Sequence, residues 1–365
     1  MAKHNPENER IKRRYFEYLK EAQRHSEASI DASAQALNRF EIQTDHKSFK
    51  AFHQQQAIAF KRKLAEQNSI RSGEKLSKST VNSILANLKK FFHWLAGQPG
   101  YKSRISYSDS DYFNLSEKET RIANARREKP VPTIGQIRHT VEQMGTSDDI
   151  ELRDRALIAF VLLTGARDSA VASLKLKHID LNSRCVYQDA REVKTKFSKT
   201  FTTHFFPVGE PFEEIVTEWV DHLRSTLLWG HNDPLFPVTK MGQNELLQFA
   251  PDGLDRRHWQ TTSPIRRIFT DAFTAAGLPC FNPHSFRNTL VRLGEKICHT
   301  PEDFKAWSQN LGHEGVMTTF NSYGNVPDHR QGELITNMAR KADQKHSALA
   351  ETISAAVLAE LAANR

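Results

Sequence analysis

Apolar residues in the first hundred positions recur at helical spacing, with basic residues between them. Successive apolar stripes lie at 11–19, 28–40, 49–64 and 81–95. Ser77 precedes the last stripe and can cap the start of a helix, and Gly97 follows it and can end one. The pattern predicts four short helices carrying many lysines and arginines.

The pattern changes after residue 132. Thr133 can cap a helix, and Asp148 and Asp149 open a long apolar helix that Gly165 ends. Residues 184–208 are rich in strand-forming residues, with Phe197-Ser198 between two strand halves. Further helices are predicted over 210–228 and 265–276, from Pro283 onward, and over 301–310. The predicted fold class is mainly α with a small antiparallel β-sheet.

Composition narrows the kind of partner. The chain of 365 residues is 38% hydrophobic and 26% charged, with a formal net charge of +8. A basic balance of this kind favours a polyanionic partner, nucleic acid before a membrane. The three cysteines are unclustered, so no disulfide framework, metal or other cofactor is expected. The longest apolar run, 156–163, is too short to cross a membrane, and the polar N-terminus has no signal core, so a cytoplasmic location at a bacterial nucleoid is expected.

The chain is long enough for two domains, each with its own core. We predict a helical domain over 1–100, a linker over 101–132, a second domain over 133–340 and a C-terminal helix over 341–365. The linker prediction rests on Gln98-Pro99-Gly100, followed by a polar and then basic stretch that is poor in large apolar residues.

Residues 283–323 hold two imidazoles, a guanidinium and a phenol. His284 and Arg287 share one face of a predicted helix because they are three residues apart. His313 follows the Leu-Gly that closes the next helix, and Tyr323 lies ten residues later. Arg can bind two phosphate oxygens at once, His can move a proton and Tyr can attack phosphorus. The stretch is therefore typical of phosphate chemistry.

Together with two upstream features, this stretch resembles the tyrosine recombinases, the phage integrase family. The matching features, in chain order, are Arg167 in Thr164-Gly165-Ala166-Arg167, a lysine near residue 196, His284-Ser285-Phe286-Arg287, Leu311-Gly312-His313 and Tyr323. The resemblance covers residues 130 to 330 or so, and upstream it rests on pattern alone. It implies a SAM-like helical DNA-gripping domain followed by an α+β catalytic domain.

The resemblance implies a transesterification at a DNA phosphodiester that needs neither metal nor ATP. Tyr323 would attack phosphorus, giving a 3′-phosphotyrosyl link and a free 5′-hydroxyl. Arg167 and Arg287 would bind the non-bridging oxygens, His284 would take part in proton transfer with the tyrosine, and His313 would donate a hydrogen bond to the phosphate.

A lysine on the predicted hairpin would protonate the departing 5′-oxygen. We favour Lys196, which directly precedes the predicted turn, and Lys194 is the alternative because the position of the turn is not fixed by the pattern. The chain also departs from the usual family pattern. Ala170 stands where an acid is usual, Phe286 and Asn288 flank the second arginine in place of Leu and His, and Tyr323 lies one residue farther from His313 than in common members.

Basic residues of the first domain and the linker are implied to contact DNA. They are Lys47, Lys50, Lys61, Arg62, Lys63, Lys78, Arg126 and Arg127. The same charges are also typical of a helical bundle whose lysines are simply solvated. The implied partners are double-stranded recombination sites, further copies of the chain in a tetramer, and accessory DNA-bending or directionality factors. The helix over 341–365 would dock either on a neighbouring protomer or on its own domain.

Four biological roles follow from the resemblance. The integrase of a mobile element is the expected one, and a Xer-like recombinase that resolves chromosome or plasmid dimers is the nearest alternative. A type IB topoisomerase would share the nicking chemistry while relaxing supercoils as a monomer. A DNA-binding regulator without catalysis is the fourth, and the full set of cations with Tyr323 argues against it.

Overall fold

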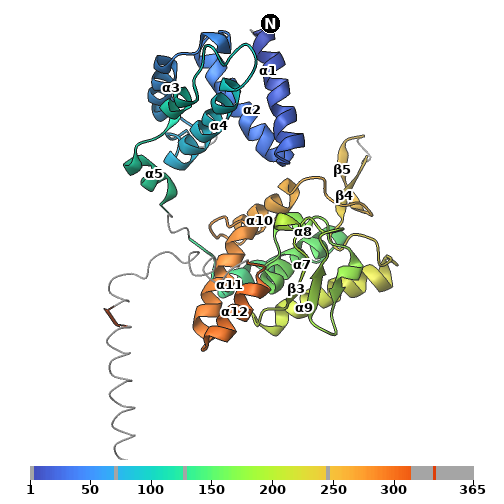
Figure 1. Ribbon diagram of the computed structural model, residues 1–365. Helices are drawn as coiled ribbons and strands as arrows, with labels where there is room; N and C mark the ends of the chain where they lie inside the picture. The colour runs from blue at the N-terminus through green and yellow to red at the C-terminus, as the bar shows by residue number, and fades with distance from the viewer. Residues whose placement is uncertain (1–3, 70–72, 126–129, 244–246, 314–331, 334–365) are drawn as a thin grey trace, which may run out of the picture. The chain divides into compact units, whose positions relative to one another are not determined.

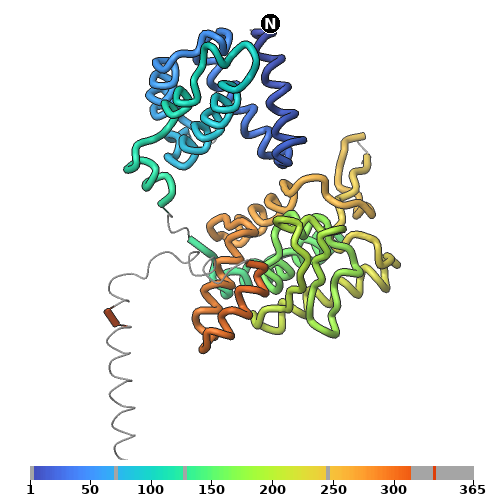
Figure 2. The backbone as a smooth tube through the Cα atoms, in the orientation of Figure 1, coloured from blue at the N-terminus to red at the C-terminus, as the bar shows by residue number. Residues whose placement is uncertain are grey.

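The computed structural model describes residues 4–69, 73–125, 130–243, 247–313 and 332–333. The chain divides into two compact units, Met1–Arg127 and Glu128–Arg365, and Figures 1 and 2 trace the elements of each. Helices dominate both units, and the strands form small antiparallel sheets in the second, so the predicted fold class is confirmed. None of the helices in the described part combines the length and apolar character that crossing a bilayer requires.

The first unit is a bundle of helices around an aromatic core. Its helices are α1 (Pro6–Glu17), α2 (Glu27–Gln43), α3 (Gln54–Glu66), α4 (Lys78–Ala96) and α5 (Glu117–Asn124). Ser77 caps α4 through a hydrogen bond from the N–H of Thr80, as the sequence predicted. The rings of Phe40, Phe92 and Phe113 meet edge-on or stacked at the centre.

The predicted linker over 101–132 is wrong in its first part. Tyr101, Ile105 and Phe113 are 4%, 2% and 1% exposed and belong to the core of the first unit. The helix α5 packs on α4, where Glu119 forms an ion pair with Lys78 at 2.7 Å. Residues 101–125 therefore fold with the first unit. The polar composition misled the prediction, because a few widely spaced apolar side chains anchor the segment.

The second unit surrounds one long buried helix. Its helices are α6 (Ile134–Glu142), α7 (Asp149–Thr164), α8 (Asp168–Val171), α9 (Glu210–Asp221), α10 (Ser263–Ala275), α11 (Pro283–Ile297) and α12 (Pro301–Asn310). The predicted caps are confirmed: Thr133 caps α6, Asp148 caps α7, and Gly165 ends α7 with φ +59°. Every residue of 156–163 is at most 1% exposed, so α7 is the centre of this core.

Two antiparallel sheets complete the second unit. The first has the order β1-β2-β3, formed by β1 (Ile179–Asp180), β2 (Cys185–Gln188) and β3 (Phe201–His204). The second pairs β4 (Val238–Gln243) with β5 (Phe249–Asp255). The strand halves predicted over 184–208 exist, and Phe197-Ser198 lies between them in a turn that the N–H of Ser198 closes on the carbonyl of Thr195 at 3.3 Å, within a longer loop over 189–200. Within that loop, Phe197 and Ser198 adopt φ of +60° and +50°.

Candidate active site

Arg167 lies immediately after the end of the central helix. The chain leaves α7 through Gly165, and Arg167 occupies the position that precedes α8. The side chain is half-buried, and burial lowers the pKa of its guanidinium. Asp168, the nearest acid, instead accepts hydrogen bonds from Arg266 on α10 at 2.7 and 2.8 Å. The usual acidic position holds Ala170, which is 1% exposed in the core.

Arg287 is a buried guanidinium that joins three segments of the chain. It lies on α11 and is only 4% exposed. One nitrogen donates to the carbonyl of Gly165, and Nη2 donates to the carbonyl of Leu311 at 2.6 Å and to Nε2 of His313 at 2.9 Å. Desolvation, and then the nearby Arg167, lower the pKa of Arg287 to about 9. A cation held by neutral acceptors in a dry site is well suited to receive an anion.

His313 follows the C-terminus of α12. Leu311 is buried at 1% exposure, and Gly312 turns the chain with φ +67°. Because a guanidinium has no acceptor, Nε2 of His313 accepts the hydrogen bond from Arg287, and the proton of the neutral ring is on Nδ1. Burial, and then the charges of Arg287, Arg167, His284 and Lys196, lower the pKa of His313 to about 4. The ring is therefore neutral near pH 7.

These side chains come from distant parts of the sequence. The charges of Arg167, Lys196, His284 and Arg287 all lower the pKa of His313, which indicates that the five groups lie near one another in the second unit. His284 is exposed on the first turn of α11, three residues before the buried Arg287. Figure 1 shows α11 and α12 next to one another, and the hydrogen bond from Arg287 on α11 reaches His313 just beyond the end of α12.

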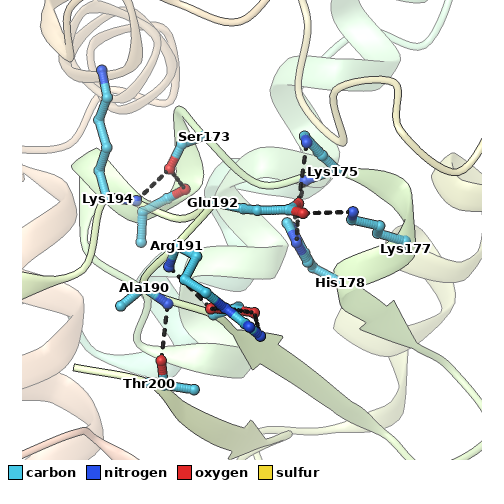
Figure 3. A network of polar contacts seen from close by, with 11 residues as sticks. Ser173, Lys175, Lys177, His178, Ala190, Arg191, Glu192, Lys194 and Thr200 are labelled. Atoms are coloured by element: carbon cyan, nitrogen blue, oxygen red, sulfur yellow. Dashed lines mark hydrogen bonds and ion pairs between the residues drawn. The ribbon is translucent and has the colours of Figure 1, made fainter. Parts of the chain in front are cut away.

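The loop that carries the lysines is fixed at its base (Figure 3). The carboxylate of Glu192 binds Lys177 at 2.8 Å and Lys175 at 3.1 Å, and these two lysines lower the pKa of Glu192 to about 2. The backbone N–H of Lys194 donates to Oγ of Ser173 at 2.8 Å. These contacts hold the loop against the segment that follows α8.

The two candidate lysines face different neighbours. Lys194 acts on His258, whose pKa is lowered by burial and then by Lys175 and Lys194. Lys196 acts on His313, and its Nζ lies 4.7 Å from the centre of the Phe197 ring. Lys196 is thus among the charges that lower the pKa of His313, whereas Lys194 is among those that lower the pKa of His258.

Sequence comparison identifies the family. Residues 133–330 match the sequence model of the phage integrase family, and residues 13–98 match that of the phage integrase N-terminal SAM-like domain. The chain belongs to the phage integrase family. It is thus a tyrosine-recombinase-type enzyme, a class that breaks and rejoins DNA strands.

Curated relatives and solved structures agree with this assignment. The chain is 22% identical over 253 residues to "Tyrosine recombinase XerC" of Lactobacillus delbrueckii subsp. bulgaricus, covering 68% of this chain and 72% of that one. It is 22% identical over 314 residues to the protein of the same name from Halalkalibacterium halodurans, covering 83% and 88%. A lambda integrase dimer bound to a COC′ core site has the same fold, with 14% identity, a TM-score of 0.60, and coverage of 88% and 96%. The Tn1549 transposon integrase in complex with transposon right end DNA also has this fold, with 14% identity and a TM-score of 0.57. The match covers 90% of this chain and 99% of that one.

Several predicted residues of this integrase-family chain lie outside the described residues. They are Tyr323, Arg126, Arg127 and the helix over 341–365. Among the described residues, no group of three or more His, Cys, Asp or Glu side chains could hold a metal ion.

The basic residues predicted to contact DNA divide into two groups. Lys50 pairs with Glu7, Lys61 donates to the carbonyl of Asn114 at 3.0 Å, and Lys78 pairs with Glu119. These three lysines pair with other groups of the first unit. The other three that the structure describes, Lys47, Arg62 and Lys63, are exposed.

The family departure at Phe286 has a packing explanation, and one partner of Arg287 was not predicted. Phe286 is fully buried and its ring meets those of Phe269 and Phe273 at 5.0 and 6.0 Å, so the larger side chain fills an aromatic cluster. Sequence reasoning did not find the carbonyl of Gly165 as an acceptor for Arg287. The available signal was a glycine two residues before the first arginine, at a helix end where carbonyls lose their helical partners.

Proposed function

We propose that this chain is a site-specific recombinase that acts on duplex DNA through a 3′-phosphotyrosyl intermediate, as the integrase of a mobile element. One observation carries the proposal: Arg287, Arg167 and a neutral His313 converge in a partly dry site, and the hydrogen bonds of Arg287 go to neutral acceptors. Both guanidinium groups are desolvated, and Arg167 also lowers the affinity of Arg287 for its proton, which favours an anion between them.

We propose a role for each group, which its position and protonation support. Arg167 and Arg287 bind the non-bridging oxygens of the scissile phosphate and stabilise the charge of the pentacoordinate state. The neutral His313 donates from Nδ1, since Nε2 accepts from Arg287. His284, exposed beside them, takes part in proton transfer with the attacking hydroxyl of Tyr323.

Lys196 supplies the proton that the departing 5′-oxygen needs. As the bond from phosphorus to the 5′-oxygen breaks, the proton moves from Nζ of Lys196 to that oxygen, and the bond between Oη of Tyr323 and phosphorus forms. The chain is joined to the 3′ end, and the free 5′-hydroxyl of a partner strand reverses the step. The energy of the phosphodiester is kept in the covalent link.

The first unit supplies binding to the duplex backbone through exposed cations such as Lys47, Arg62 and Lys63. The lambda and Tn1549 integrases are seen in complexes with DNA, the lambda one as a dimer. They support duplex recombination sites as the partner and self-association on DNA, which we propose to reach a tetramer. Curated relatives named XerC favour a second role, resolution of chromosome or plasmid dimers, on the same chemistry.

The test of the chemistry uses a duplex from the ends of the host element, nicked just downstream of the expected cleavage position. We expect the wild type, without metal or ATP, to form a denaturation-resistant protein–DNA band, and Tyr323→Phe to form none. Tyr187→Phe is the matched control, because Tyr187 is 45% exposed on β2. A band with Tyr323→Phe would refute the assignment of Tyr323 as the nucleophile. If the wild type binds the duplex but forms no band, the proposed reaction is refuted.

Two further substrates separate the roles. Recombination between two element ends, and not between chromosomal dimer-resolution sites, would support the integrase. The reverse preference would support the Xer-like role. Relaxation of a supercoiled plasmid that lacks either site, with no recombinant product, would instead indicate a topoisomerase.

A further inference from the structure

Asn310 is the last residue of α12, and its side chain reaches the edge of the three-stranded sheet. Its Nδ2 donates to the carbonyl of His204 at 2.8 Å, and its Oδ1 accepts from the backbone N–H of His204 at 2.7 Å. One side-chain amide thus pairs with both peptide groups of a single residue, as a neighbouring strand would. Because β3 is at the edge of the sheet in the order β1-β2-β3, this pairing gives a partner to backbone groups that β2 does not reach.

Two more contacts join the same places. The carbonyl of Asn310 accepts from Oγ1 of Thr203 at 3.1 Å, and Thr203 in turn accepts from Nε2 of Gln188 at 3.0 Å. Thr203 and Gln188 are buried, at 1% and 3% exposure. The ring of Phe201 closes over Gly312, where an added Cβ would lie 2.7 Å from Cζ of Phe201. The segment from Asn310 to Gly312 is therefore in contact with Phe201, Thr203 and His204 of β3.

The attachment links the two parts of the active site. The loop over 189–200 leads directly into β3 and carries Lys196. The end of α12 leads directly into Leu311, whose carbonyl holds Arg287, and His313, which Arg287 also binds. A shift of β3 along α12 would change the distance between the ammonium group and the groups that bind the phosphate.

We propose that Asn310 is a positioning residue for strand cleavage. Its amide fixes β3 against the end of α12, so that Lys196 reaches the departing 5′-oxygen while Arg287 and His313 hold the phosphate. This inference rests on the proposed function, and in particular on the role of Lys196. Asn310 touches neither the phosphate nor the leaving oxygen in this account, and it acts only through the backbone of His204.

The test measures single-turnover cleavage of two nicked duplexes that differ in one atom. One has the natural 5′-bridging oxygen at the scissile phosphate, and the other has sulfur there. A thiolate departs without needing a proton, so sulfur compensates for a missing or misplaced general acid and for little else. Lys196→Ala is the reference variant, expected to be slow on oxygen and restored on sulfur.

We expect Asn310→Ala to cleave the oxygen substrate about 10- to 100-fold more slowly than the wild type, the range that follows from small misplacement of a catalytic group. Sulfur should restore most of this loss, and affinity for the uncleaved duplex should not change. Asn182→Asp, an exposed change in the turn between β1 and β2, is the control for the charge that an Asn310→Asp variant adds, and it should cleave normally. Equal slowing on both substrates, no slowing, or a parallel loss of DNA affinity would overturn the inference.

A second variant reports on the hydrogen bond itself. Asn310→Asp keeps the acceptor for the N–H of His204 but turns a carboxylate toward the His204 carbonyl. Protonation of that carboxylate restores a donor. The cleavage rate of Asn310→Asp should therefore approach that of the wild type as the pH falls, whereas the cleavage rate of Asn310→Ala should not. A pH-independent deficit for Asn310→Asp would overturn the inference.

These outcomes distinguish failure of the proposed role of Asn310 from failure of the proposed recombinase function. A wild type that forms no covalent link refutes the proposed reaction. Failure of sulfur to restore Lys196→Ala refutes the role of that lysine, and the inference with it. Restoration of Lys196→Ala without restoration of Asn310→Ala refutes the inference alone.

Discussion

Gly165 is the residue whose replacement tests the architecture of the site most directly. It ends α7 with φ +59°, and its carbonyl accepts from the buried Arg287. A Cβ added there would lie 2.9 Å from Cδ2 of Leu311 and 3.0 Å from Cδ1 of Leu290. Both leucines are at most 1% exposed, and Arg287 binds the carbonyls on both sides of this contact, so the leucines have little room to move away.

Two costs therefore add in Gly165→Ala. The left-handed conformation costs an L-residue about 1–2 kcal/mol, and overpacking a filled core costs about 1–3 kcal/mol. The free energy of unfolding should fall by about 2–5 kcal/mol in all. Gly277→Ala is a matched control, because Gly277 has φ +69° but nothing within 4 Å of the added Cβ, and it should lose only the conformational part, about 1–2 kcal/mol.

The assay is urea unfolding of the full chain, followed by tryptophan fluorescence. Trp219, Trp229, Trp259 and Trp307 all lie in the second unit, so they report on the part that contains both glycines. Gly165→Ala should also slow covalent complex formation, because the displaced carbonyl releases Arg287. A variant that is no less stable than Gly277→Ala would refute the packing argument, and one that is unstable but cleaves at the normal rate would refute the link to Arg287.

Three further outcomes follow from the same structure. Arg287→Lys keeps the charge, but a lysine cannot reach Gly165, Leu311 and His313 together. The rate of single-turnover cleavage should therefore fall by about 100-fold or more, while DNA affinity stays close to that of the wild type. A loss of rate under tenfold would contradict bidentate binding of the phosphate by Arg287. The pKa of His313 is lowered from 6.5 to about 4 on folding, so the unfolded chain takes up the proton first and the free energy of unfolding should fall as the pH falls from about 6.5 to about 4. His313→Gln should remove that part of the slope in urea midpoints measured across this range, and an unchanged slope would show that another group is responsible. Arg62→Gln should reduce the slope of log affinity against log salt by about one, whereas Lys78→Gln, whose ammonium already pairs with Glu119, should reduce it less and lower the stability of the first unit.

The helices of the chain could be predicted largely from local signals. Ser77, Thr133 and Asp148 are good caps because their side chains accept from N–H groups two or three residues later, and Gly165 ends a helix because it adopts a left-handed conformation at low cost. Such interactions span only a few residues, so they are legible in the sequence. The strands were predicted, but not the loop over 189–200, because its fixed shape depends on contacts with residues 173–178 that are distant in sequence.

The site is a different case. The spacing of His284 and Arg287 predicts a shared helix face, but nothing local indicates that Arg167 and Lys196 approach His313. That expectation came from the resemblance to a family. The partners of Arg287 were not predictable at all, since backbone carbonyls such as those of Gly165 and Leu311 have no signature in side-chain chemistry.

The folding of residues 101–125 onto the first unit decides where the chain can be cut or exchanged. A fragment that stops at residue 100 would leave the cavity of Phe113 open and remove the acid that pairs with Lys78, so it should aggregate or unfold. A hybrid recombinase that takes its DNA-gripping half from a relative should be joined near residue 127 rather than residue 100. The unit that evolution could shuffle as a block is thus longer than its four-helix sequence pattern suggests.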